Sequence, residues 1–144
     1  MEDLTIASLE GRTLTRVVGS TDADFAFLFE DNCSVWVCEW RIVQGGRIVW
    51  AAGDHGQRFG WSEPLDGVAK VTELIVGRKV VKATLGRLGD IEILFDNEAR
   101  LQSFTNSCGY ESASIKLPGG LTVLVLGGGT VDGYQPPRTS ERPR

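Results

Sequence analysis

Residues 24–30 of this 144-residue chain read DFAFLFE, and a closely similar pattern, DIEILFD, returns 66 positions later in residues 90–96. The segment before it repeats at the same offset, because residues 11–14 read GRTL and residues 77–80 read GRKV. Two correspondences at one offset predict that the chain contains the same structural unit twice. A chain of this length forms one domain, so we expect the two units to share one core.

Apolar residues alternate within both copies, as Phe25, Phe27 and Phe29 in the first and as Ile91, Ile93 and Phe95 in the second. A period of two is typical of a strand with one buried face, so Phe27, Phe29, Ile93 and Phe95 are predicted core residues. A weaker correspondence at an offset of 73 relates residues 40–42 to residues 113–115. Short turns rich in Gly, Asp and Asn separate the strands, and such short connections predict antiparallel pairing.

Further apolar runs predict strands at residues 11–18, 33–43, 47–52, 78–85, 101–104, 110–117 and 121–126. The run at 33–43 is apolar on both faces and predicts one long central strand, with Trp36 and Trp40 on the same face. Helical spacing follows Ser62, a predicted cap, and ends at Gly77. Residues 3–10 suit either a helical turn or an edge strand.

The predicted fold is mainly β (α+β). Two pseudo-symmetric antiparallel units pack into one barrel- or sandwich-like domain with one or two short helices. The domain spans residues 1–130, with units at 9–53 and 74–129 joined by a loop and short helix at 54–76. Residues 131–144 are rich in Pro, Arg, Ser and Thr, which predicts a disordered tail.

Charge and hydropathy exclude several classes of partner. The net charge is −4, and the tail after Pro137 contributes +2 from three Arg against one Glu, so the rest of the chain carries −6. An acidic body argues against nucleic acid and against anionic lipid as partners. No apolar run approaches the ~20 residues of a membrane helix. The acidic start, Met1-Glu2-Asp3, is no secretory signal, so we expect a cytoplasmic protein with no membrane partner.

The cysteines and the single histidine argue against a metal site. Cys33, Cys38 and Cys108 show neither a CxxC motif nor Cys/His spacing. Cys33 and Cys38 fall on one predicted strand with opposed side chains, so they cannot bridge each other within it. We therefore predict reduced, mostly buried thiols and no cofactor.

Residues 53–61 break every periodic pattern and predict a polar, Gly-rich loop. The loop carries Arg58, Phe59 and Trp61, which are residue types typical of interface hot spots. The first unit has this loop and the second has no counterpart, and added loops on rigid scaffolds often carry function. A plain connection between the units is the simpler alternative.

His55 lies in the same loop and is a candidate general base near Asp54, Glu63 and Asp66. No nucleophile can be placed beside it from the sequence. A solvated loop histidine is therefore the simpler interpretation, and no catalytic residues are assigned.

Tyr110 and Glu111 form a second candidate site together with Asn106, Ser107 and Cys108, against the simpler alternative of a bulged strand end with a buried Cys. Glu111 and Glu39 occupy approximately equivalent places in the two units, and paired carboxylates can act as acid and base. Single charges at two strand ends explain this pair equally well. The Gly-rich residues 127–129 lack the Lys-Ser/Thr of a phosphate loop, so that function is rejected.

The second half shows an ordered set of motifs at residues 77–80, 91–97, 110–115 and a Gly-rich end at 118–120 or 127–129. This set resembles a bacterial domain family of unknown function, common in actinobacteria, with the pattern G-x-x-V, L-x-L-x-F-x-[DN]-G, YE-x-W-x-[IL] and a Gly-rich C-terminus. Ala113 and Glu98 replace the Trp and the Gly of that pattern. The resemblance implies no activity, although small domains of this kind often lie near mobile elements or toxin–immunity loci.

These observations favour a non-catalytic protein-binding or immunity-type module with a basic protein partner. The predicted binding residues are His55, Arg58, Phe59, Trp61, Tyr110 and Glu111. Uncovered sheet edges also lead us to expect a homo-oligomer. The alternative is a small-molecule binder or minor enzyme with a pocket near His55, Trp61 and Tyr110.

Overall fold

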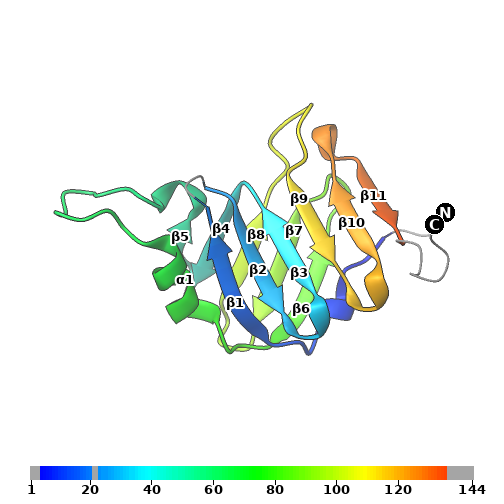
Figure 1. The fold of residues 1–144 in the computed structure, drawn as a ribbon, viewed down its shortest axis with the longest axis horizontal. Helices are drawn as coiled ribbons and strands as arrows, with labels where there is room; N and C mark the ends of the chain where they lie inside the picture. The colour runs from blue at the N-terminus through cyan, green and yellow to red at the C-terminus, as the bar shows by residue number, and fades with distance from the viewer. Residues whose placement is uncertain (1–3, 21–22, 136–144) are drawn as a thin grey trace, which may run out of the picture.

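Figure 1 shows a computed structural model of the protein, which describes residues 4–20 and 23–135. Two antiparallel sheets pack face to face as a sandwich and do not close into a barrel, so the predicted mainly β fold class is confirmed. One helix, α1 (Gly67–Ile75), accompanies the strands. The strands are β1 (Leu14–Gly19), β2 (Phe25–Phe29), β3 (Ser34–Val37), β4 (Trp40–Gln44), β5 (Arg47–Ala51), β6 (Val80–Leu85), β7 (Ile91–Phe95), β8 (Arg100–Ser103), β9 (Ala113–Lys116), β10 (Thr122–Val125) and β11 (Val131–Tyr134).

Each sheet combines strands from both halves of the chain. The six-stranded sheet has the order β1-β2-β3-β9-β10-β11, and the five-stranded sheet has the order β5-β4-β8-β7-β6. The first half therefore contributes β4 and β5 to the sheet of the second half, which contributes β9, β10 and β11 in return. This exchange intertwines the halves, so neither sheet can form from one half alone.

The two halves pair their strands in the same register. Leu14 opposes Phe29 in the β1–β2 pair, and Val80 opposes Phe95, each 66 positions later, in the β6–β7 pair. Both pairs contain a register irregularity just after this first pairing. The core positions predicted from the alternation are confirmed as buried: Phe27, Phe29, Ile93 and Phe95.

The halves meet through residues that lie at equivalent positions in the two copies of the pattern. A single antiparallel bridge joins Thr13 to Lys79, which is its own counterpart at an offset of 66. The rings of Phe29 and Phe95 stack with their centroids 6.4 Å apart and their planes 6° from parallel. The equivalent aromatic residues of the two halves therefore pack against each other within the core.

The long strand predicted across Cys38 is wrong, because the chain changes sheets there. β3 ends at Val37, and β4 begins at Trp40 in the other sheet. The two intervening residues shift the alternation, so Val37 and Trp40 both turn toward the core between the sheets. Trp36 lies on the opposite face of β3, partly buried, and does not share a face with Trp40. The apolar residues on both faces thus reflect a crossover between sheets and not a central strand.

The helix begins later than Ser62, the predicted cap. Asp66 caps α1 instead, because its carboxylate accepts a hydrogen bond from the Ala69 N–H at 3.2 Å. The helix buries Val71 and Ile75 and packs mainly against β1.

At both ends of the described chain, the structure adds an element that the sequence did not assign. Residues 4–10 contain a 3-10 turn, Ala7–Leu9, so of the two alternatives for this segment the helical turn is present and the edge strand is not. The turn packs against β6. Val131–Tyr134 forms strand β11 on the edge of the six-stranded sheet, so this part of the predicted tail is ordered. Residues 136–144 lie outside the described residues.

Candidate functional site

The loop between β5 and α1, residues 52–66, is the longest excursion from the sandwich in Figure 1, and we call it the finger. Its two arms pair through backbone hydrogen bonds, because Gly56 N–H donates to Leu65 O at 2.9 Å and Leu65 N–H donates to Gln57 O at 2.7 Å. At its tip, Phe59 and Gly60 have φ angles of 43° and 86°. Positive φ at both central residues is typical of a type I′ turn, so the finger resembles a short hairpin.

The tip of the finger exposes two aromatic side chains. Phe59 is 66% exposed and Trp61 is 72% exposed. Arg58 has an internal role, because its guanidinium donates to the Ser62 carbonyl at 2.7 Å and its own carbonyl accepts from the Trp61 N–H at 2.7 Å. Arg58 therefore holds the turn closed while the two aromatic rings face solvent.

His55 lies at the base of the finger and anchors it. Its Nδ1 accepts a hydrogen bond from the Gly67 N–H at 2.9 Å, and its ring packs edge-on against Phe25 at 5.3 Å. Asp54 accepts from the Ala51 N–H at 3.0 Å. The interpretation of His55 as a solvated loop residue is therefore wrong, because the side chain joins the finger to helix α1 and to the core.

The structure does not bring Tyr110 and Glu111 to the finger. Both precede β9 and lie in the loop of residues 104–112, where Tyr110 is 80% exposed and its N–H donates to Ser107 Oγ at 3.0 Å. Figure 1 shows this loop and the finger leaving the sandwich at separate places. Arg58, Phe59 and Trp61 thus form one surface, and a shared pocket with Tyr110 is not formed.

The cysteines are free thiols in three different environments. Cys33 is buried, Cys38 is partly buried and Cys108 is exposed, so the expectation of mostly buried thiols fails for Cys108. Cys33 precedes β3 and Cys38 follows it, so the predicted single strand does not contain both. Burial raises the pKa of both Cys33 and Cys38, and the carboxylates of Asp24, Glu111 and Glu39 raise that of Cys38 further. A raised pKa disfavours the nucleophilic thiolate.

The glycine run at residues 127–129 serves close packing. A Cβ on Gly127 would lie 2.7 Å from the backbone of Gly109, and one on Gly129 would lie 2.7 Å from the Leu88 carbonyl oxygen. The Gly128 N–H donates to Ser107 O at 2.7 Å. Only residues without a side chain allow this turn to approach both neighbouring loops.

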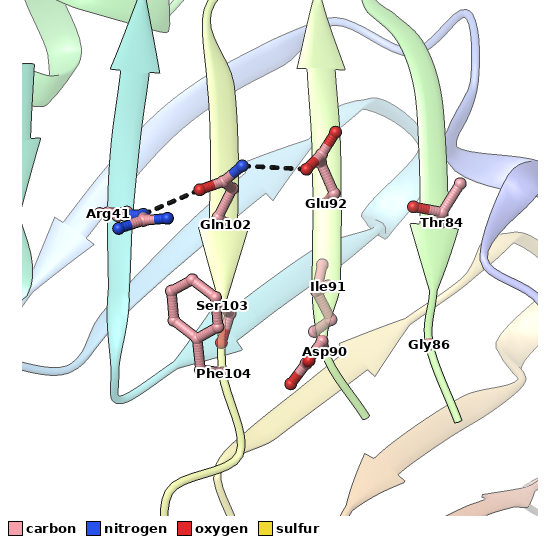
Figure 2. A pocket seen from close by; sticks show the side chains of 9 residues that line it. All are labelled: Arg41, Thr84, Gly86, Asp90, Ile91, Glu92, Gln102, Ser103 and Phe104. Atoms are coloured by element: carbon pink, nitrogen blue, oxygen red, sulfur yellow. Dashed lines mark hydrogen bonds between the residues drawn. The ribbon is translucent and has the colours of Figure 1, made fainter. Parts of the chain in front are cut away.

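Sequence reasoning missed a polar row on the outer face of the five-stranded sheet. Figure 2 shows it: the Arg41 Nε–H donates to Gln102 Oε1 at 2.8 Å, and Gln102 Nε2 donates to Glu92 Oε2 at 3.0 Å. The row borders a hollow of 290 Å³, which we call the Arg41 hollow and whose other walls include Asp90 and Phe104. Aligning the two units residue by residue would have found it, because Gln102 and Glu92 stand where the other unit has Trp36 and Ala26.

Residues 4–20 and 23–135 show neither a cluster suited to a metal ion nor a membrane-spanning helix. No cluster of three or more His, Cys, Asp or Glu side chains in these residues could hold a metal ion. None of their helices has the length and hydropathy needed to cross a membrane. Comparison of the chain with protein-family models, with curated proteins and with solved structures yields no match.

Proposed function

We propose that this protein is a non-catalytic binding module of the immunity type, located in the cytoplasm, which holds a protein partner through the tip of the finger. The observation that carries this proposal is the exposure of Phe59 and Trp61 on a turn held by internal hydrogen bonds. Large aromatic side chains contribute most to interface hot spots, and a preformed loop loses little entropy on binding. The acidic charge of the chain favours a basic partner.

The rest of the finger is built to present these two side chains. His55 and Asp54 fix its base, and Arg58 fixes its turn. We therefore assign contact to Phe59 and Trp61, and positioning to His55 and Arg58. Tyr110 and Glu111 lie on another loop and would belong to a separate contact surface.

The proposal also covers self-association. Two sheet edges are capped by acidic side chains, because the Ala83 N–H donates to Glu10 at 3.1 Å and the Ala51 N–H donates to Asp54 at 3.0 Å. Such caps oppose the addition of a further strand at β6 and at β5. The expected homo-oligomer would therefore form at another edge, and light scattering at high protein concentration tests it. A strict monomer would remove this part of the proposal.

The main test is the affinity of a purified partner for variants of the finger. Affinity capture from the native host with wild-type protein supplies the partner, and calorimetry then measures its Kd. Trp61→Ala should weaken binding by about 2 kcal/mol, or roughly thirtyfold, because a central aromatic anchor is lost. Phe59→Ala should act in the same direction.

A matched control uses an exposed apolar residue elsewhere. Leu88 is 65% exposed in the β6–β7 turn, so Leu88→Ala removes similar surface at a distance from the finger. It should leave the Kd unchanged. A partner that binds Trp61→Ala as tightly as wild type would show that the finger is not the contact surface.

A further inference from the structure

The outer faces of the two sheets differ at equivalent positions. On the five-stranded sheet, four side chains oppose one another across β6, β7, β8 and β4: Thr84, Glu92, Gln102 and Arg41. On the six-stranded sheet, the row at the same register is Val18, Ala26, Trp36 and Ser114. Because the second row sustains the same pairing without a charged residue, the fold does not require the polar network. The network therefore calls for a functional explanation.

The network orients the guanidinium of Arg41 toward the hollow. Its Nε–H is engaged by Gln102, and its central carbon lies 5.1 Å from the centroid of the Phe104 ring. These two contacts fix the plane of the group. Its terminal nitrogens make no hydrogen bond with residues 4–20 or 23–135. Terminal guanidinium nitrogens form the fork that binds a carboxylate in a bidentate manner.

The carboxylates beside Arg41 differ in how far they are already paired. Each oxygen of Glu92 already accepts a hydrogen bond, Oε1 from Arg100 at 2.6 Å and Oε2 from Gln102 at 3.0 Å. Asp90, on the opposite wall, accepts from the described residues only a long bond of 3.4 Å, donated by the Thr105 N–H. Its counterpart Asp24, 66 positions earlier, accepts two shorter bonds, from Ser20 and Trp36. Asp90 therefore remains available as an acceptor.

The Arg41 hollow thus presents one cationic donor fork and one available carboxylate within 290 Å³. This volume is at the small end of ligand pockets. A simple anion at Arg41 would be repelled by Asp90, and a simple cation at Asp90 would be repelled by Arg41. A ligand with both charges satisfies both groups at once. We propose that this hollow binds a small zwitterion of the α-amino acid class, with its carboxylate on Arg41 and its ammonium on Asp90.

This proposal is independent of the finger, and the full-length protein tests it directly. Amide chemical shifts are recorded by NMR while free L-α-amino acids are added one at a time, with acetate and methylammonium as single-charge probes. At least one amino acid should produce saturable shifts at residues 84–92 and 102–104 with a Kd of about 1 mM or tighter. Acetate and methylammonium should each bind at least about tenfold more weakly, since each engages only one of the two charges.

Two variants and one control decide the outcome. Arg41→Ser, which installs the counterpart residue of the other sheet, and the isosteric Asp90→Asn should each weaken binding about tenfold or more. Arg16→Ser removes an exposed cation from the other sheet and should change nothing. The proposal is overturned if no amino acid gives saturable shifts, if both variants bind as wild type does, or if acetate binds as tightly as the best amino acid. The last result would identify a plain anion site.

Discussion

The two sheets share one pairing scheme, yet the outer faces of their middle strands differ at equivalent positions. At equivalent positions in the middle strands, Trp36 and Ala26 stand on the six-stranded sheet where Gln102 and Glu92 stand on the five-stranded sheet. The buried faces do not diverge in this way, because Phe27 and Ile93 are both fully buried and apolar. The core thus constrains the inward positions in both halves, and the outward positions are free to acquire function.

A second contrast concerns the chain segments just beyond β5 and β10, which occupy corresponding places in the two halves. β10 turns at residues 127–129 and continues directly into β11, which pairs with it. Its counterpart β5 continues instead into the finger and helix α1. The finger therefore takes the place, along the chain, of a sixth strand. This substitution leaves one sheet with five strands and gives the protein its exposed pair of aromatic side chains at Phe59 and Trp61.

The largest expected effect tests whether Phe29 and Phe95, at equivalent positions in the core, contribute equally to stability. Phe29→Ala and Phe95→Ala should each lower the free energy of unfolding by about 3–5 kcal/mol, because each removes one buried ring of the stacked Phe29–Phe95 pair. The double variant should cost less than the two added together, since the rings contact each other. Urea denaturation measures all three values. A cost below about 1 kcal/mol for either single variant would mean that the halves are not energetically equivalent.

Replacing glycine with alanine should destabilise the protein more in the β6–β7 turn than in the β9–β10 turn. Gly89 has φ +83°, and a Cβ there would collide with Val125 of β10, so Gly89→Ala should cost about 2–4 kcal/mol. Gly119→Ala is the control, because Gly119 has φ +84° with open space around it, and should cost about 1–2 kcal/mol. The first half carries Ala23 at the place of Gly89. Equal melting temperatures for the two variants would contradict a tight contact at Gly89.

Exchanging residues between the outer rows should reveal a smaller effect. Trp36→Gln installs the Gln102 side chain in the row of Val18, Ala26 and Ser114 and should cost about 1–2 kcal/mol, because the partly buried indole is lost. Arg41→Ser should cost less than about 1 kcal/mol, since its contacts are partly exposed. Chemical denaturation measures the free energy of unfolding of both variants. A larger loss for Arg41→Ser would indicate that the polar network stabilises the sheet and would weaken its functional interpretation.

The smallest expected effect is a difference in acid sensitivity. Hydrogen bonds from Ser20 and then Trp36 lower the pKa of Asp24 from its ordinary value of 3.8. A lowered pKa in the folded state stabilises the protein above pH 3.8, and this contribution is lost as the pH falls through the folded-state pKa. Asp24→Asn should therefore be less stable than wild type near neutral pH and approach it in acid. Thermal melts from pH 2 to pH 7 measure the effect. A difference in melting temperature between Asp24→Asn and wild type that does not change with pH would exclude this role.

Several features could be predicted from particular residues. The alternation of Phe25, Phe27 and Phe29 correctly indicates a strand and its buried face, because a half-buried strand imposes a period of two. The exposed loop at Arg58, Phe59 and Trp61 is recognisable by its lack of periodicity. Their assignment as a binding surface stays a prediction.

Other features could not be read from local patterns. The predicted start of α1 is wrong because Ser62 and Asp66 are both good caps. The structure uses the later one, where the Gly67 N–H also donates to His55. The resemblance to a bacterial family also stays a prediction.

By itself, the sequence determined that this protein is built from short antiparallel strands and which side chains along many of them face the core. Such properties follow from local chemistry, since periodicity and turn residues act over a few positions. Only the tertiary structure decided that the chain crosses between sheets at Cys38 and Glu39, and that β4 pairs with β8 and β9 with β3. Pairing between distant strands depends on which apolar faces can be buried together, and no local pattern contains that information. The alignment of Arg41 with Gln102 and Glu92, and with it the hollow beside them, exists only because of this exchange.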